Sequence, residues 1–352
     1  MVLITKKHGK RFYRCLWFII GFLIICIGFE QESHALRREA VEIVRVLPKD
    51  AIPAIKYPSF VPAYQARLDD KEPIIGITID GESRAYSLYL LNHHEIVNDT
   101  INDKPIVVAW CPLADLAVAY GRVIKKKKYT FGVSGKLLKN TLVMFDYETN
   151  SLWPIVYGEA ISGRLSGKKL EKGIDYQKMS WGAWKKLHPD TLVLSYNGRN
   201  TADSDTYKDY HMSDETGIRP VKNKDQRLDA KTRVIGIEIQ GKHKAYQLSD
   251  VYNAKMISDD FYGMHLLIYG NKETERVMVY GREVGGSTLS FYNDVTDGLA
   301  TDATTNTTWD LETGVGIEGS LQGESLNRLH FIDIYWFVWA DYYQGTEIFY
   351  PR

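Results

Sequence analysis

Residues 74–90 read IIGITIDGESRAYSLYL, and residues 234–250 read VIGIEIQGKHKAYQLSD, which align on them without a gap. Eight of the seventeen aligned residues are identical across an offset of 160 positions. In the first segment an apolar stretch is followed by Asp80-Gly81 and then by a second apolar stretch, which is the pattern of a β-hairpin with a two-residue turn. The chain is therefore expected to form this hairpin twice.

The repeat continues beyond the hairpin. Ten residues between Asp146 and Leu170 recur 156 positions later, between Asp302 and Leu326. Two tryptophans follow, and Trp181 and Trp184 recur 155 positions later as Trp336 and Trp339. A period of this length indicates a duplicated domain, because solenoid and propeller repeats are only about 20–50 residues long. We expect two similar lobes about a pseudo-twofold axis, with a ligand site in the cleft between them.

The spacing of apolar residues predicts a β-rich α+β fold, with two homologous lobes of mostly antiparallel sheet and short helices. Residues 90–97 and 181–188 are predicted to be helical, and residues 105–110 and 116–120 are predicted to be strands on either side of a Cys-Pro turn. The predicted organisation is a signal peptide or N-terminal membrane anchor (1–35), an extended proline-rich segment (36–67), a first lobe (68–196), a polar connector (197–232) and a second lobe (233–352).

Charge and composition exclude some classes of protein. The chain of 352 residues has 44 Lys and Arg against 44 Asp and Glu, so its formal net charge is zero. Without a basic field, nucleic acid is not an expected partner. The hydrophobic fraction of 44% is ordinary for a globular protein with a real core.

The N-terminus has the pattern of an export signal. Basic residues precede a charge-free run from Cys15 to Phe29, which at 15 residues is short for a membrane-spanning helix, since such a helix needs about 20. Small residues at Ser33 and Ala35 suit cleavage after Ala35, and an uncleaved anchor with the body outside is the alternative. Either form predicts a periplasmic or cell-surface protein that meets the membrane only through this segment.

The candidate chemical site lies in the first lobe. His94 and Glu95 belong to the predicted helix, and Cys111 follows one strand later. Imidazole, carboxylate and thiolate groups together can bind a transition metal. Alternatively, a charged histidine could stabilise the thiolate. Asp99 or Asp115 could orient such ligands.

The second lobe lacks these residues, since Asn253, Ala254 and Lys255 replace residues 93–95 and Gly270-Asn271 replaces Cys111-Pro112. The alternative interpretation is a packing histidine and an inert buried thiol. No cofactor-binding loop is predicted, because the glycine pattern at 314–319 follows a polar turn and opens no helix.

Several longer strings carry a resemblance to a known family. They include IIGITIDGESRAYSLYLLNHHEIVND, WCPL, TFGVSGKLLKNTLVMFDYETNSLW, SWGAWKKLHPDTLVLS and YKDYHMSDE. Over residues 50–352 the chain resembles the exported bacterial family catalogued as domain of unknown function 3179. The resemblance implies export and supplies no reaction. Members of that family typically carry a second cysteine in a CPLC-type motif, where this chain has Ala114, so thiol–disulfide exchange by a cysteine pair is not expected here.

Two functional hypotheses follow. The first is an exported ligand-binding or accessory module of the cell envelope, with an unidentified ligand or envelope protein in the cleft. The alternative is a metal- or thiol-dependent enzyme that uses His94, Glu95 and Cys111.

Overall fold

The computed structural model describes residues 42–351, and the described residues from Ile43 onward form one compact unit. The predicted signal segment and its cleavage site after Ala35 lie outside the described residues. Within residues 42–351, no helix has the length and apolar character needed to cross a membrane.

Strands are far more abundant than helices in the described chain, in sheets that are mainly antiparallel, with five short α-helices, and this confirms the predicted β-rich class. The strands before the connector are β1 (Ile43–Arg45), β2 (Ser59–Pro62), β3 (Pro73–Ile79), β4 (Glu82–Ser87), β5 (Ile96–Ile101), β6 (Lys104–Cys111), β7 (Leu116–Gly121), β8 (Val123–Ile124), β9 (Lys127–Lys128), β10 (Phe131–Leu138), β11 (Thr141–Asp146), β12 (Leu152–Pro154), β13 (Tyr176–Ser180) and β14 (Leu192–Ser195). The helices of this part are the 3-10 turns η1 (Ala63–Gln65) and η2 (Pro112–Ala114) and the α-helices α2 (Leu88–Leu91) and α3 (Trp181–Leu187).

The elements after β14 follow a similar order. The connector contains α4 (Lys208–Met212). The later strands are β15 (Arg233–Ile239), β16 (Lys242–Gln247), β17 (Met256–Phe261), β18 (Met264–Asn271), β19 (Arg276–Gly281), β20 (Glu283–Val284), β21 (Ser287–Thr288), β22 (Leu299–Thr301), β23 (Thr308–Asp310), β24 (Val315–Glu318), β25 (Asn327–Arg328), β26 (Ile332–Tyr335) and β27 (Glu347–Ile348). The later helices are α5 (Leu248–Ala254) and α6 (Trp336–Tyr342).

The predicted hairpin is present in both halves of the chain. β3 pairs with β4 through Ile74 and Ser87 to Ile79 and Glu82, and β15 pairs with β16 in the corresponding register. The first hairpin lies in a sheet of order β13-β3-β4-β14-β2, and the second in a sheet of order β26-β15-β16-β27. Each hairpin thus has an antiparallel neighbour on one side and a parallel strand on the other.

A tryptophan packs on a glycine in each hairpin. A Cβ atom added to Gly76 would lie 2.3 Å from the ring of Trp184, and one added to Gly236 would lie 2.3 Å from the ring of Trp339. The indole N–H of Trp184 donates to the Thr191 hydroxyl over 3.0 Å, and Trp339 repeats this bond to Thr346, also over 3.0 Å. Only glycine leaves room for the ring at these two hairpin positions, which explains why both residue types recur.

The second repeated motif is a turn organised by a buried aspartate. Asp146 accepts hydrogen bonds from the backbone N–H of Thr149 and from the indole N–H of Trp153, the latter over 3.0 Å. Asp302 accepts the same bonds from Thr305 and Trp309, the latter over 2.9 Å. These recurring tryptophans are core residues that satisfy a buried carboxylate.

The prediction of a helix over residues 90–97 is wrong. The helix α2 ends at Leu91, residues 92–94 form a turn, and Ile96 already begins β5. Glu95 has a left-handed backbone with φ of 54°, which ends helical geometry. The β-branched residues Ile96 and Val97 favour a strand, and Val97 also bridges to Ile55.

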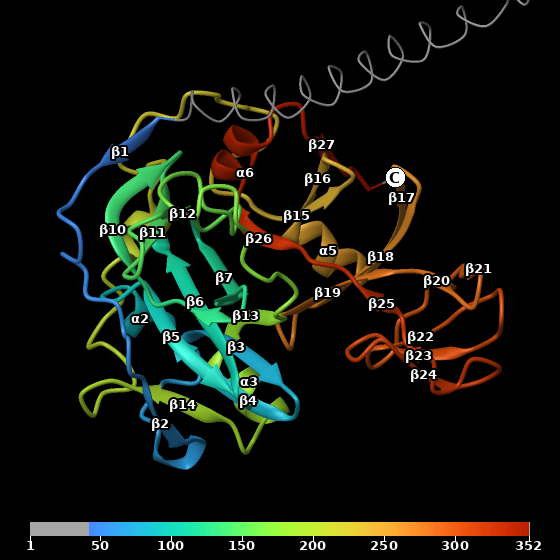
Figure 1. Ribbon diagram of the computed structural model, residues 1–352. Coiled ribbons are helices and arrows are strands. Elements are labelled where there is room, and N and C mark those ends of the chain that lie inside the picture. Colours follow the sequence, from blue (N-terminus) through green and yellow to red (C-terminus); the bar gives the residue numbers. More distant parts are fainter. Residues whose placement is uncertain (1–41, 352) are drawn as a thin grey trace, which may run out of the picture. The chain divides into compact units, whose positions relative to one another are not determined.

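The two halves meet along strands that correspond to each other. β7 of the first half lies against β26 of the second, and β13 of the first half lies against β19 of the second. Figure 1 shows the blue-to-green strands of the first half beside the orange-to-red strands of the second. Since β7 corresponds to β19 and β13 to β26 in element order, each contact is the counterpart of the other.

One hairpin is longer in the first half. Phe131 of β10 pairs with Asp146 of β11, whereas its counterpart Phe291 bridges to Asp302, four residues closer along the chain. The tip of the longer hairpin reaches α6, where the Thr141 hydroxyl lies 2.5 Å from the Tyr342 hydroxyl. This extension therefore joins the first half to the last helix.

Candidate functional site

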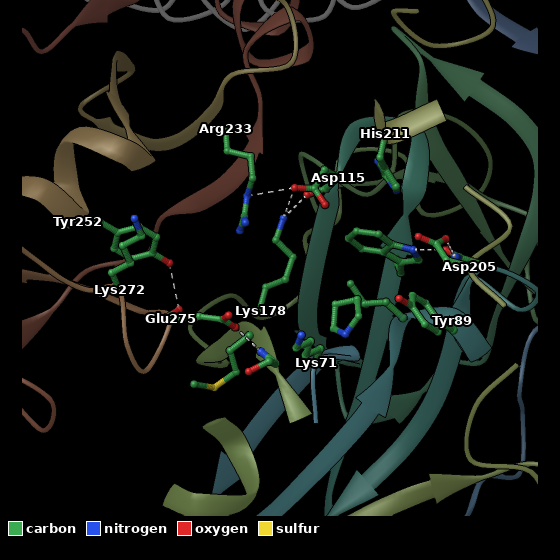
Figure 2. A pocket seen from close by; sticks show the side chains of 16 residues that line it. Lys71, Tyr89, Asp115, Lys178, Asp205, His211, Arg233, Tyr252, Lys272 and Glu275 are labelled. Atoms are coloured by element: carbon green, nitrogen blue, oxygen red, sulfur yellow. Dashed lines mark hydrogen bonds and ion pairs between the residues drawn. The ribbon is translucent and has the colours of Figure 1, made fainter. Parts of the chain in front are cut away.

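A pocket of about 440 Å³ opens where the two halves meet the connector. Its walls come from the first half, from the connector and from the second half, and Figure 2 shows ten of its polar and aromatic residues. The lining residues are Lys71, Pro73, Leu88, Tyr89, Asn92, Trp110, Asp115, Lys178, Met179, Ser180, Asp205, His211, Arg233, Tyr252, Lys272 and Glu275. The sequence predicts a ligand site in a cleft between two lobes, and ligand binding in this pocket stays a prediction.

Three charged residues of the pocket lining, Asp115, Lys178 and Arg233, form a cluster of alternating charges with Asp333. The Lys178 ammonium lies 2.6 Å from the Asp115 carboxylate and 3.4 Å from that of Asp333. The Arg233 guanidinium lies 3.2 Å from Asp115 and also pairs with Asp333. Lys178 and Asp115 come from the first half and Arg233 and Asp333 from the second, so the cluster joins the two halves. Figure 2 shows Asp115, Lys178 and Arg233.

The sequence places these charges at matching positions. Lys178 precedes Trp181 by three residues and Asp333 precedes Trp336 by three residues, so opposite charges occupy the same place in β13 and β26. Asp115 precedes β7, and Glu275 precedes β19 at an offset of 160. Lys178 of β13 and Asp333 of β26 therefore form an ion pair between corresponding strands of the two halves.

Burial changes the acidity of the cluster. The side chain of Lys178 is 6% exposed, and burial, followed by the charge of Arg233, lowers its pKa. Burial by itself would raise the pKa of Asp333, but the charges of Arg233 and Lys178 overcome this effect and hold the pKa below its ordinary value. Asp333 is therefore a carboxylate at neutral pH, held between two cations.

Aromatic residues next to these charges are held in place by hydrogen bonds, and the Lys178 ammonium lies 5.7 Å from the centre of the Trp110 ring. The indole N–H of Trp110 donates to the Asn92 side-chain oxygen over 2.8 Å, and the Asn92 amide donates to the Asp205 carboxylate over 3.0 Å. Tyr89 follows in α2, and Tyr252 of α5 contributes from the second half. A buried chain of this kind fixes the ring that faces the pocket.

The second half has no counterpart of this aromatic wall. The strands β6 and β18 match at an offset of 160, so Gly270 corresponds to Trp110 and Asn271 to Cys111, which corrects the sequence alignment of Gly270 on Cys111 by one position. A Cβ atom on Gly270 would lie 2.6 Å from Val251 of α5. The helix α5 has seven residues where α2 has four, and it packs on β18, the strand that corresponds to β6 of Trp110.

The structure brings two of the predicted site residues together. The backbone N–H of Trp110 donates to the Glu95 carbonyl, so Cys111 lies in the strand next to Glu95. Burial raises the pKa of Glu95 to about 8. Burial, reinforced by the charge of Glu95, raises the pKa of the Cys111 thiol to about 12. Cys111 is 2% exposed and a thiol at neutral pH, which is the state of an unreactive cysteine.

His94 is directed elsewhere. Its Nδ1–H donates to the Pro53 carbonyl over 2.8 Å, and its ring packs edge-on against Tyr196 at 4.7 Å. The side chain lines a separate surface hollow with Arg199 and Asp203. Within residues 42–351, no three His, Cys, Asp or Glu side chains gather as a metal ion would require.

The two predicted orienting residues have other partners. Asp99 accepts a hydrogen bond from the Tyr86 hydroxyl over 2.6 Å and lies 3.7 Å from Arg84. Asp115 belongs to the charge cluster with Lys178. Neither carboxylate contacts the side chain of His94 or Cys111 among the interactions of the described chain.

Sequence reasoning missed most of the pocket. Lys71, Lys178, Arg233 and Lys272 were not singled out, and Asp205 and His211 were assigned only to a polar connector. One signal was available, because the repeat offset of 155 places Lys178 and Asp333 at the same strand position with opposite charges.

Comparison with known proteins gives one match. A family model described as Protein of unknown function (DUF3179) matches residues 49–346, which confirms the resemblance seen in the sequence. No curated protein and no solved structure matches the chain.

Proposed function

We propose that this chain, which belongs to the protein family of unknown function DUF3179, is a binding protein whose small-molecule ligand occupies the pocket between its two halves. The observation that carries the proposal is the pocket of about 440 Å³, whose lining combines aromatic residues with charged side chains. Ligand sites in proteins are commonly concave, within a range of roughly 300–1,000 Å³, and combine apolar walls with a few placed polar groups.

We also infer that the two halves are homologous lobes from an internal duplication, with residues 68–196 and 233–352 as the lobes and 197–232 as the connector. Support comes from the recurring Gly76–Trp184 and Gly236–Trp339 contacts and from the matching registers of the two hairpins. On this view the pocket lies at the junction of two copies, one of which supplies the aromatic wall.

The proposed place of action is outside the cytoplasm, in the periplasm or at the cell surface. The support is the basic N-terminus followed by the 15-residue apolar run that ends at Phe29. An accessory role in the cell envelope fits a binding protein delivered there.

The metal- or thiol-dependent alternative has weaker support. Burial raises the pKa of the Cys111 thiol to about 12, and the ring of His94 is bonded to Pro53 rather than directed at the thiol. A reactive thiolate needs the opposite environment, with nearby positive charge and access to solvent.

A thermal-shift screen tests the proposal. Residues 36–352 and the variant Tyr89→Ser, which installs the residue found at position 249 of the second half, are screened against a library of small acids, bases and neutral compounds. A hit that raises the melting temperature of the unmodified protein, and does so less in Tyr89→Ser, supports binding in the pocket. Hits that stabilise both proteins equally place binding elsewhere and contradict the proposal.

A further inference from the structure

We propose that the ligand of this pocket is a small organic anion, with a carboxylate or phosphate group attached to a flat apolar body. The inference rests on the proposed function, since it names the chemical class that the same pocket accepts. It follows from three features of the pocket: carboxylates already bonded within the protein, two lysines without partners, and an aromatic wall.

The acidic groups of the pocket already accept bonds from donors of the protein itself. Asp115 pairs with Lys178 and Arg233, one oxygen of Asp205 accepts from Asn92 and the Tyr207 N–H, and one oxygen of Glu275 accepts from the Ser180 N–H. A cationic ligand would have to compete with these bonds.

Two lysines at the pocket are not occupied in this way. Lys71 and Lys272 are exposed residues of the lining, and the ammonium group of neither makes a hydrogen bond or ion pair with residues 42–351. Figure 2 shows them on different sides of the pocket, one from each half of the chain. Ammonium groups at a pocket edge raise the local concentration of anions and donate charge-assisted hydrogen bonds.

In the second half, the lysine at the position of Lys71 is bonded within the protein. Lys231 corresponds to Lys71 at the offset of 160, and its ammonium donates to the carbonyl oxygens of Tyr210 and Ser213 in the connector. In the second half the protein itself supplies the acceptors. In the first half no described backbone segment supplies acceptors for the Lys71 ammonium, so a ligand can supply them.

The body of the ligand follows from the aromatic wall. Trp110 is 1% exposed and fixed by Asn92, so the rings open to a ligand are those of the half-buried Tyr89 and Tyr252, which lie on different sides of the pocket (Figure 2). Tyrosine rings at a pocket present apolar faces for a flat group, at little entropic cost to the protein. An inorganic anion would contact the lysine ammonium groups but would leave the aromatic faces exposed to water.

The test uses three probes that share a ring system and differ in charge. Equilibrium dialysis measures binding of naphthaleneacetate, naphthaleneacetamide and naphthylethylamine to residues 36–352, with inorganic phosphate as a fourth probe. The expected order is anion, then neutral amide, then amine, with about tenfold between the first two because charge-assisted hydrogen bonds are the stronger kind.

Two double variants locate the preference. Lys71→Ala with Lys272→Ala removes the proposed ammonium groups, and Lys127→Ala with Lys128→Ala removes the same charge from the exposed strand β9. The first pair is expected to bind the acetate no better than the amide, while the amide keeps its affinity. The second pair is expected to behave as the unmodified protein.

The outcomes separate the two proposals. Equal or stronger binding of the amide or the amine by the unmodified protein overturns the anion class while the pocket remains a binding site. Binding of phosphate alone overturns the flat apolar body. If the β9 double variant also loses the preference for the acetate over the amide, the role of Lys71 and Lys272 is overturned. If no probe binds, the ligand class is overturned. If the thermal-shift screen is negative as well, the proposed function is overturned too.

Discussion

The two halves of the chain have the same framework but different surfaces at their junction. Gly76 and Trp184 correspond to Gly236 and Trp339, with the same close approach of ring and backbone in each half. Tyr86 donates to Asp99 over 2.6 Å, and Tyr246 donates to Asp259 over 2.7 Å. The residues that keep these contacts are those that hold the hairpins in place.

The differences gather around the pocket. Trp110 and Asn92 of the first half correspond to Gly270 and Tyr252 of the second, and α5 is longer than α2. Recurring residues of this chain hold the fold, whereas several of the replaced residues line the pocket. Three sets of substitutions test this difference, and they are ordered by the size of the expected effect.

The largest effect is expected from Lys178→Met. The change leaves Asp115 and Asp333 without the buried ammonium that lies between them, and loss of one partner from a buried ion pair costs about 3–5 kcal/mol of unfolding free energy. Urea denaturation measures the difference.

The matched control is Lys185→Met, which removes an ammonium from an exposed pair with Asp70 at 2.8 Å. An exposed pair contributes at most about 1 kcal/mol. Equal losses for the two lysines would contradict the described cluster between the halves.

The second effect concerns pH. The pKa of Glu95 is raised by burial from 4.5 to about 8, so the folded protein holds a proton that the unfolded chain releases. The stability that this proton confers is complete below pH 4.5 and is lost as pH rises through 8, with a slope of about 1.4 kcal/mol per pH unit. Glu95→Gln, a mimic of the protonated acid, is expected to remove this slope and to stabilise the protein at pH 7 by roughly 3 kcal/mol.

The control is the counterpart residue in the second half. Lys255 shares the left-handed backbone, with φ of 59°, but is exposed. Lys255→Gln is expected to leave the dependence of unfolding free energy on pH unchanged. The same pH dependence in Glu95→Gln and in the unmodified protein would show that Glu95 is not buried as described.

A smaller and symmetrical effect is expected from Gly76→Ala and Gly236→Ala. In each variant the new Cβ atom would lie 2.3 Å from a tryptophan ring, and overpacking of this kind costs about 1–3 kcal/mol. Chemical denaturation should give similar losses for the two variants. Gly281→Ala is the control, since its Cβ atom would meet nothing closer than 3.6 Å. A clear loss at one position alone would break the equivalence of the two hairpins.

The sequence predicted local structure better than the site. The Asp80-Gly81 turn and the recurring Trp184 and Trp339 were sufficient to predict the hairpins and the short helices behind them, because turn chemistry and core packing act between near neighbours. The helix predicted over residues 90–97 was wrong because Ile96 pairs with Ala109, a strand partner that no local pattern reveals.

The candidate site was only partly accessible to sequence reasoning. Glu95 and Cys111 were expected to meet and do lie in neighbouring strands, since one hairpin joins them. Lys71 and Lys272 are about 200 residues apart, and they approach one pocket only because the two halves pack together. The metal and thiol chemistry proposed for His94, Glu95 and Cys111 stays a prediction.

The most direct test of the binding claim is a nuclear magnetic resonance titration of the tryptophan indole N–H signals with naphthaleneacetate. Both tryptophans are buried, but the Trp110 indole N–H donates to Asn92 of the pocket lining, whereas the Trp309 indole N–H donates to Asp302 in the second half. Trp110→Phe assigns the first signal and Trp309→Phe the second. The account predicts a saturable shift of the Trp110 signal while the Trp309 signal stays in place. A Trp110 signal that does not move, or that moves together with all the others, would contradict a ligand site between the two halves.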